Sequence, residues 1–177
     1  MLIQEKVVLA QLSYEPYVDE EGLVNTELEG KIAVYAIFDE SQQIQYIGYS
    51  RNLYKSLLQH LVKQNDRCYW YKYYLIDRPN RSVLEQIKSD WEGENPDFNK
   101  SDEELKLWTD AIDIHQQMTD SQKEEFQKAD GLGQTKLLKQ FAREIQTKIK
   151  QKLADRGVKV NLKFNSKLRE QGLVDLK

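Results

Sequence analysis

The stretch that decides the fold is residues 31–50, KIAVYAIFDESQQIQYIGYS. Residues 31–38 form a nearly continuous apolar run, which is typical of a buried strand, and residues 43–49 form a second strand-like run. Residues 39–41, DES, have the composition of a turn. Two strands joined by so short a turn are most simply an antiparallel hairpin.

Downstream of the hairpin, the sequence predicts a helix, a third strand and a second helix. Apolar residues recur at helical spacing over 52–64, with Asn52 as the N-cap. Residues 67–76, RCYWYKYYLI, are rich in aromatic side chains and favour a strand, and residues 81–91 place apolar side chains on one helical face. The order β-β-α-β-α indicates an α+β fold.

Residues 1–30 form an N-terminal extension before the hairpin. Within it, residues 6–14, KVVLAQLSY, are apolar and β-branched enough to predict a strand. The acidic stretch over 15–29, which ends next to Gly30, is typical of a loop.

Residues 97–177 form a helical C-terminal region, which we expect to pack on the core. The clearest helix has one apolar stripe, basic residues elsewhere and Gly157 as its stop. The predicted elements are helices over 101–112, 119–129 and 134–156, and a short strand over 158–164.

Composition sets the class of protein. The 177 residues (20.9 kDa) are 40% hydrophobic and 31% charged, with a mean hydropathy of -0.74, as expected of one globular domain with appendages. The chain has no apolar run of about 18 residues, and residues 1–12 lack the pattern of a secretory signal. The lone Cys68, beside only His60 and His115, makes neither a disulfide nor a zinc ligand set. A cytoplasmic location is the expectation.

The net charge of -3 hides a segregation of charge along the chain. Residues 1–49 carry 2 basic and 9 acidic side chains, 50–88 carry 8 and 3, 89–130 carry 4 and 13, and 131–177 carry 12 and 4. Such blocks are solvated faces, segments that pack against each other, or binding surfaces. The acidic total argues against strong non-specific binding of nucleic acid.

Several residues of the hairpin and the next two helices follow a recognisable pattern. Tyr35 and Tyr46 stand eleven residues apart on the two strands, and Gly48 follows. The other features are Ser50-x-x-Leu53 at the helix start, His60, and Leu84-Glu85 in the second helix. In these features the chain resembles the GIY-YIG nuclease family over residues 31–96, about a third of the chain.

This resemblance implies a small three-stranded antiparallel sheet flanked by helices, and cleavage of DNA at a single-metal site with Mg²⁺ or Mn²⁺. The expected binding partner is DNA, with RNA as the alternative. By analogy, Tyr35, Tyr46 and His60 are expected to be catalytic, Glu85 to be catalytic and the metal ligand, and Gly48 to allow close approach of nucleic acid. The chemistry is reasonable because a phenol near a metal-bound water can move protons while a carboxylate holds the metal.

The sequence departs from the family in two places. Ala33-Val34-Tyr35 replaces Gly-Ile-Tyr, which keeps the phenol, and Ser56 stands where the family places a phosphate-binding arginine. Losing such an electrostatic group typically raises the barrier by about 2.7 to 4 kcal/mol. The cations that could replace it and contact nucleic acid are Arg51, Lys55 and Lys88.

Three functional hypotheses follow. The first is a nucleic-acid-interacting member of that family with weakened or lost cleavage. The second is an active divalent-metal-dependent DNA endonuclease in which Arg51 or a lysine replaces the missing arginine. The third is a protein-interaction module on the same scaffold.

Two segments have further alternative interpretations. The aromatic residues 69–74 are either a base-stacking surface or sheet residues packed under helices. The basic helix over 134–156 either packs its apolar stripe on the core or binds an acidic protein partner, nucleic acid or an anionic membrane surface.

Overall fold

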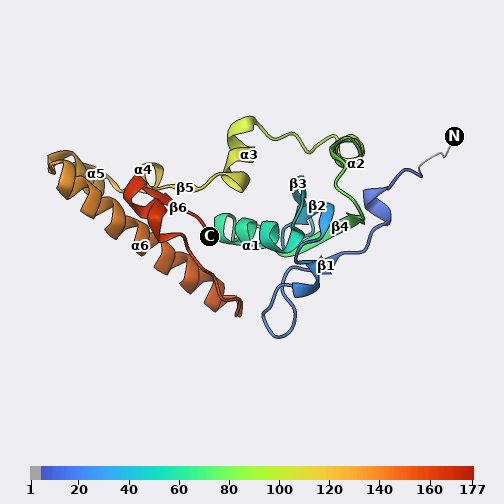
Figure 1. Ribbon diagram of the computed structural model, residues 1–177, viewed down its shortest axis with the longest axis horizontal. Coiled ribbons are helices and arrows are strands. Elements are labelled where there is room, and N and C mark those ends of the chain that lie inside the picture. The colour runs from blue at the N-terminus through green and yellow to red at the C-terminus, as the bar shows by residue number, and fades with distance from the viewer. Residues whose placement is uncertain (1–4) are drawn as a thin grey trace. The chain divides into compact units, whose positions relative to one another are not determined.

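The computed structural model describes residues 5–177 and confirms the α+β class. The chain forms two compact units, the first ending at Trp108 and the second running over Thr109–Lys177 (Figure 1). Among the described residues, no helix combines the length and apolarity needed to cross a bilayer. The first four residues of the expected N-terminal extension lie outside the described part of the chain.

Unit 1 is built on an antiparallel sheet of four strands in the order β1-β4-β2-β3. Strands β2 (Ile32–Phe38), β3 (Ile44–Ser50) and β4 (Trp70–Ile76) confirm the three predicted strands. The fourth strand, β1 (Glu15–Pro16), is only two residues long and pairs with the start of β4. The expectation of a three-stranded sheet therefore missed a short edge strand.

The helices of unit 1 begin where asparagine side chains cap them. Helix α1 (Leu53–Lys63) is capped by Asn52 and helix α2 (Arg81–Glu94) by Asn80. Each cap accepts a hydrogen bond from the backbone N–H three residues later, which satisfies a donor that the first helical turn leaves free. A third helix, α3 (Asp102–Thr109), ends the unit.

The two faces of the sheet carry different residues. In the ladder, Tyr35 lies opposite Gly48 and Tyr73, whereas Val34 lies opposite Tyr49. Because successive side chains of a strand point to opposite faces, Tyr35 and Tyr49 lie on opposite sides of the sheet. The face of Tyr49 packs with α2 in a hydrophobic core that includes Val34, Ala36, Phe38, Ile47, Leu84, Ile87 and Trp91.

The strand predicted over 6–14 is wrong. Its centre is a 3-10 turn, η1 (Leu9–Gln11), and a second such turn, η2 (Thr26–Leu28), follows in the acidic loop. The apolar side chain of Leu9 is buried in the α2-side core, but its N–H donates to both carboxylate oxygens of Glu94, at 3.1 and 3.0 Å. The backbone N–H of Leu9 is therefore paired with a side chain of α2 rather than with a neighbouring strand.

Unit 2 is organised around the long helix α6 (Gly131–Asp155). Its buried residues face η3 (Ser166–Gln171), the short helices α4 (Ile114–Gln117) and α5 (Asp120–Lys128), and strand β6 (Leu173–Val174), which pairs with β5 (Ile112–Asp113). The apolar stripe of α6 is thus covered by its own unit. The expected packing of the wider region 97–177 on the core stays a prediction.

Two sequence expectations for unit 2 need correction. Helix α6 begins at Gly131 rather than 134, because the Asp130 carboxylate caps it by accepting from the N–H of Gly133 at 2.7 Å. The predicted strand over 158–164 is wrong: within it only Phe164 makes a β-bridge, with Leu176. Val158 and Phe164 are buried by side-chain packing instead.

Candidate functional site

Two tyrosines and one histidine named by the sequence analysis do meet in unit 1. The Tyr35 hydroxyl lies 2.6 Å from Nε2 of His60, which reaches it from α1. The Tyr46 ring lies with its centroid 4.7 Å from that of His60 and 5.9 Å from that of Tyr35. The three side chains therefore form one cluster between the sheet and α1.

Trp108 of α3 covers this group, and we call the four residues Tyr35, Tyr46, His60 and Trp108 the tyrosine–histidine cluster. The Trp108 ring stacks on Tyr46, with a centroid distance of 5.3 Å and an interplanar angle of 17°. Its backbone carbonyl lies 2.8 Å from Nδ1 of His60. A carbonyl oxygen only accepts, so Nδ1 carries the proton and Nε2 accepts from Tyr35.

The cluster is closed to solvent. The exposed fractions are 2% for Tyr35, 9% for Tyr46, 4% for His60 and 1% for Trp108. Burial raises the pKa of Tyr35 well above its ordinary value and lowers the pKa of His60 to about 3. At neutral pH the imidazole and the phenols are uncharged and hydrogen-bonded to one another, which is the state of a satisfied polar core.

Ser56, at the position expected to hold an arginine, is half-buried and hydrogen-bonds with Tyr35 of this cluster. Its hydroxyl donates to Oγ of Ser50 at 2.6 Å, and Ser50 Oγ also accepts from the N–H of Asn52 at 3.0 Å. A hydrogen bond with Ser56 lowers the pKa of Tyr35, against the larger upward effect of burial. The serine thus fits as a small hydroxyl in a polar network.

A contact within the same strand explains why residue 48 is a glycine. A Cβ added there would lie 2.7 Å from Cε1 and 2.8 Å from the hydroxyl of Tyr46. The Tyr46 ring cannot easily retreat, because Trp108 stacks on it. The close approach that Gly48 permits is therefore made by Tyr46 of the same strand.

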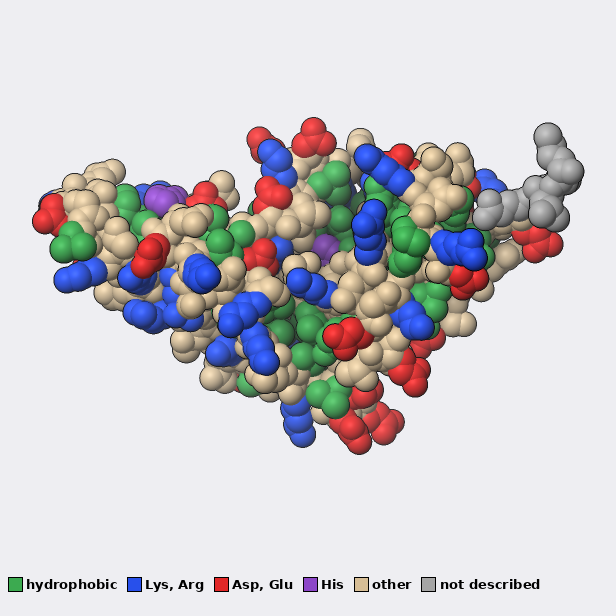
Figure 2. Space-filling model, in the orientation of Figure 1, with side chains coloured by type: hydrophobic (Ala, Val, Ile, Leu, Met, Phe, Trp, Pro, Cys, Tyr) green, Lys and Arg blue, Asp and Glu red, His purple; other side chains and the backbone are tan. Residues whose placement is uncertain are grey.

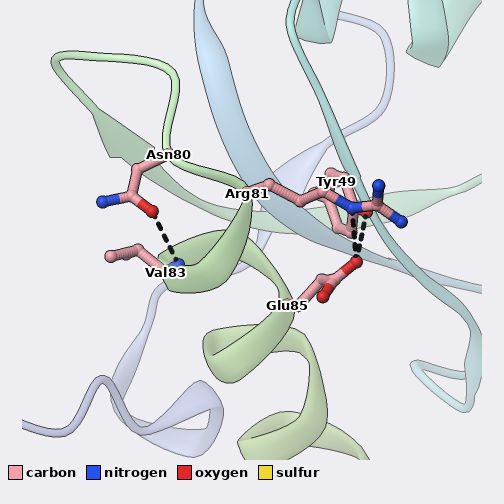
Figure 3. A network of polar contacts seen from close by, with 5 residues as sticks. All are labelled: Tyr49, Asn80, Arg81, Val83 and Glu85. Carbon is pink, nitrogen blue, oxygen red and sulfur yellow. Dashed lines mark hydrogen bonds and ion pairs between the residues drawn. The ribbon is translucent and has the colours of Figure 1, made fainter.

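Glu85 makes its side-chain contacts outside this cluster, with Arg81 and Tyr49, as Figure 3 shows. It extends from α2, on the other face of the sheet, and is exposed. Its Oε1 accepts from Arg81 Nε at 2.8 Å and from the Tyr49 hydroxyl at 3.2 Å. The hydrogen bond and charge of Arg81 hold the pKa of Glu85 below its ordinary value. The acid and the two phenols do not share a cleft.

The residues expected to contact the metal and the phosphate are either engaged with other side chains or exposed to solvent. Glu85 is engaged by a guanidinium, which a bound cation would have to displace, and Lys88 pairs with Glu92 at 3.3 Å. Arg51 and Lys55 are exposed at the start of α1. Across the described residues 5–177, no group of three or more His, Cys, Asp or Glu side chains is placed to hold a metal ion. The expectation of Mg²⁺ or Mn²⁺, which relied on Glu85 as the one carboxylate ligand, stays a prediction.

Unit 2 carries a different kind of surface. Lys136, Lys139, Arg143 and Lys150 lie within about 60° of one another around α6, at 100° per residue. We call these four residues the α6 basic face. Figure 2 shows Lys and Arg side chains gathered along α6. Only Lys139 of the four pairs with a carboxylate among the described residues, that of Glu170 at 2.9 Å.

Beside the α6 basic face lies a buried polar pair that sequence reasoning missed. Gln146 is only 5% exposed, and its Oε1 accepts from Arg169 Nη2 of η3 at 2.8 Å. At 100° per residue, position 146 falls at the edge of the apolar stripe of α6. This position was the sequence pattern that could have indicated a buried side chain. The amide nitrogen of Gln146 and Nε of Arg169 are buried without a partner.

A curated protein is similar to a part of this chain. No protein-family model matches the chain. The chain is 33% identical over 75 residues to "Bifunctional monothiol glutaredoxin-S16, chloroplastic" of Arabidopsis thaliana, covering 38% of this chain and 26% of that protein. The chain thus spans about a quarter of the length of this relative, and the match shows similarity to a part of it.

This match corrects the family assignment made from the sequence. The similar protein is named as a glutaredoxin, not as a nuclease, and no family model supports the GIY-YIG assignment. The nuclease family, the two nucleic-acid hypotheses and the description as an endonuclease are accordingly withdrawn, and the third hypothesis loses the nuclease scaffold on which it was placed. The geometry gives a separate physical reason, since Trp108 fills the expected cleft and Glu85 lies on the opposite face. The catalytic and nucleic-acid-binding roles of individual residues were expected only from this family assignment, and they no longer have that support.

Proposed function

We propose that the chain is a binding protein whose α6 basic face in unit 2 binds an acidic segment of a protein partner. The observation that supports this most strongly is the row of cations at positions 136, 143 and 150. These side chains are exposed and have no carboxylate partner among the described residues. Lys150 also lies over the Phe164 ring, with its ammonium 5.5 Å from the ring centroid. A regular row of exposed cations without carboxylate partners is a surface suited to a partner that supplies carboxylates.

The thiol function suggested by the name of the similar protein is not carried over to this chain. Thiol–disulfide chemistry requires an accessible thiolate. The chain has a single cysteine, Cys68, which is completely buried. Its thiol donates to the backbone carbonyl of His60 at 3.6 Å. A buried thiol so held behaves as a small apolar side chain.

The choice of a protein over DNA or RNA rests on charge. Glu144 and Asp155 lie on the same helix as the α6 basic face, and α5 adds Asp120, Glu124 and Glu125 to this unit. At 100° per residue the two acids of α6 stand about 80–160° round the helix from the basic face, so the observation against a phosphate backbone is the charge of the chain rather than acids on this face. The whole chain is also acidic, with a net charge of -3. A short acidic peptide can contact the cations alone.

The test is a binding titration of the full-length chain with a fluorescein-labelled oligoglutamate peptide, followed by fluorescence anisotropy. We expect saturable binding that weakens with added salt, because the contacts are between charges near the surface. Reversing two charges, Lys136→Glu with Arg143→Glu, should weaken binding by about tenfold.

The matched control is Lys123→Glu with Lys128→Glu, which makes the same change of charge on α5 of the same unit. We expect this variant to keep most of the affinity. Equal loss in both variants would mean that only net charge matters and would contradict the proposal. Tighter binding of a DNA duplex or an RNA strand than of the peptide would favour nucleic acid as the partner instead.

A further inference from the structure

One large apolar side chain of unit 2 is left in solvent. Leu132 is 71% exposed, and the other exposed large hydrophobic side chains among residues 5–177 all belong to unit 1. Leu132 stands in the first turn of α6, two residues after the cap Asp130. Because the side chains of a helix tilt toward its N-terminus, a side chain of the first turn extends past the helix end, where no preceding turn covers it. The fold therefore presents this leucine to solvent.

Its position round the helix places Leu132 on the α6 basic face. At 100° per residue, Leu132 lies within about 40° of each of the four cations of that face and in line with Lys150. Lys136 follows it by one turn, about 6 Å along the helix axis. Leu138 and Phe141 of the buried stripe stand about 120° and 180° round the helix from Leu132. The exposed face of α6 thus begins with an apolar side chain and continues with cations.

Charge alone gives such a face little affinity. Exposed ion pairs each contribute little and are weakened by salt. Burial of a leucine side chain in an interface adds a favourable contribution in proportion to the apolar area removed from water, and this contribution is not screened by salt. The row from Leu132 to Lys150 is about 27 Å long, which an extended segment of about eight residues spans. An acidic segment with one apolar residue at its end matches the whole row.

We propose that the acidic partner of the α6 basic face carries an apolar residue at one end of its acidic segment, and that this residue packs on Leu132. This inference rests on the proposed function and adds what the partner supplies besides carboxylates. Lys136, Arg143 and Lys150 contact the acids, while Leu132 fixes where the segment ends on the helix. The apolar contact thus sets the register of an otherwise repetitive row of charges.

A lipid bilayer is the other kind of partner that combines with cations beside an apolar side chain. A helix that lies in a membrane interface needs a broad apolar face, which it buries at the boundary of the acyl chains. The broad apolar stripe of α6 is covered within its own unit, and among the described residues Leu132 is the one large apolar side chain that unit 2 exposes. These observations favour a protein segment.

The test compares two fluorescein-labelled peptides by fluorescence anisotropy on the full-length chain. Both are oligoglutamates of the length of the row, and one begins with leucine where the other begins with serine. We expect the leucine peptide to bind about five- to tenfold more tightly. In Leu132→Ala the ratio of the two affinities should fall to about one, because most of the apolar contact is removed. In Leu107→Ala, which truncates the exposed leucine of α3 in unit 1, the ratio should stay as in the unmodified chain.

Two further measurements identify the contact as apolar. Added salt should weaken both peptides equally and leave their ratio unchanged, because it screens the ion pairs that the peptides share. Leu132→Ala should keep the Tm of the unmodified chain, because the side chain that it truncates is exposed. A lost ratio at an unchanged Tm then reports the contact with the peptide and not unfolding.

The outcomes separate this inference from the proposed function. Equal affinity of the two peptides for the unmodified chain, with both weakened by Lys136→Glu and Arg143→Glu, would sink the contact on Leu132 and leave the basic face as the partner surface. An advantage of the leucine peptide that persists in Leu132→Ala would also overturn the inference, since the leucine would then pack elsewhere. Failure of both peptides to bind would overturn the proposed function and this inference with it.

Vesicles of phosphatidylcholine with phosphatidylserine test the alternative partner. Tighter binding of the chain to these vesicles than to the leucine peptide, lost in Leu132→Ala, would assign the face to an anionic bilayer and overturn a protein segment as its partner. We expect the vesicles to bind more weakly than the leucine peptide, because a single leucine offers little apolar area to a bilayer.

Discussion

At the scale of single residues, His60 shows how one hydrogen-bond pattern sets the character of the tyrosine–histidine cluster. Nδ1 donates to the Trp108 carbonyl and Nε2 accepts from Tyr35, so the neutral ring has both nitrogens satisfied. Protonation would place a charge in a region that is 4% exposed. Burial is the main reason that the pKa of His60 falls from 6.5 to about 3.

This lowered pKa predicts acid sensitivity. Between pH 6.5 and about 3 the unfolded chain binds a proton at residue 60 and the folded protein does not, so the stability of the folded state falls as the pH falls. The loss is at most about 1.4 kcal/mol per pH unit for one proton. His60→Gln, which can donate to the Trp108 carbonyl and accept from Tyr35, should show a shallower decline.

Urea unfolding of both proteins from pH 7 to pH 3.5 measures this difference. Carboxyl groups titrate in both proteins and cancel in the comparison. Parallel stability curves would mean that His60 in the folded protein accepts a proton as readily as in the unfolded chain, contrary to its burial.

At the scale of elements, α3 is held by Trp108. Most of this helix is exposed, whereas the Trp108 side chain is 1% exposed and stacks on Tyr46. Trp108→Ala should destabilise unit 1 by about 3–5 kcal/mol. It should also increase proteolytic cleavage before α3, because the helix loses its anchor. The measurements are urea unfolding and limited proteolysis.

Leu107→Ala is the control for this prediction. Leu107 is the neighbour of Trp108 and is 53% exposed, so its truncation should change stability by less than about 0.5 kcal/mol. Equal effects of the two substitutions would show that Trp108 does not hold α3 in place.

Sequence reasoning predicted elements well where the pattern and the caps agree. The hairpin at β2 and β3 and the asparagine caps of α1 and α2 are local features, and they are confirmed. The predicted strand over 6–14 fails because its apolar residues pack on α2, far along the chain. No local pattern records that Glu94 accepts from the N–H of Leu9.

The candidate site shows the same limit. The sequence brings Tyr35 and Tyr46 near α1 because neighbouring strands are joined by a short turn. It does not record which face of the sheet α2 packs on, so Glu85 was expected beside the phenols. Nor does it show that Trp108, far along the chain, fills the space above Tyr46. The pair Gln146 and Arg169 was missed because helix and 3-10 turn meet only in the folded unit.

At the scale of the whole molecule, the N-terminal residues belong to the fold of unit 1. Tyr17 is 1% exposed and its hydroxyl donates to the Leu57 carbonyl of α1. On the other face, the buried ammonium of Lys72 donates to the Leu9 carbonyl at 3.3 Å, and the Trp91 indole donates to the Val7 carbonyl at 3.0 Å. Residues near the start of the chain therefore make buried hydrogen bonds on both faces of the sheet.

Deletion of residues 1–17 should consequently destabilise unit 1 by several kcal/mol. It exposes apolar core that Leu9 and Tyr17 cover, and it leaves the buried Lys72 ammonium without its carbonyl acceptor.

The single substitution Tyr17→Phe removes one buried hydrogen bond and keeps the ring, so it should lower the free energy of unfolding by only about 1–2 kcal/mol. Urea unfolding followed by tryptophan fluorescence reports on this unit, since Trp70, Trp91 and Trp108 all lie in it. An unchanged unfolding midpoint after the deletion would mean that the sheet and its helices are stable without these residues, and that their contacts add nothing to the core.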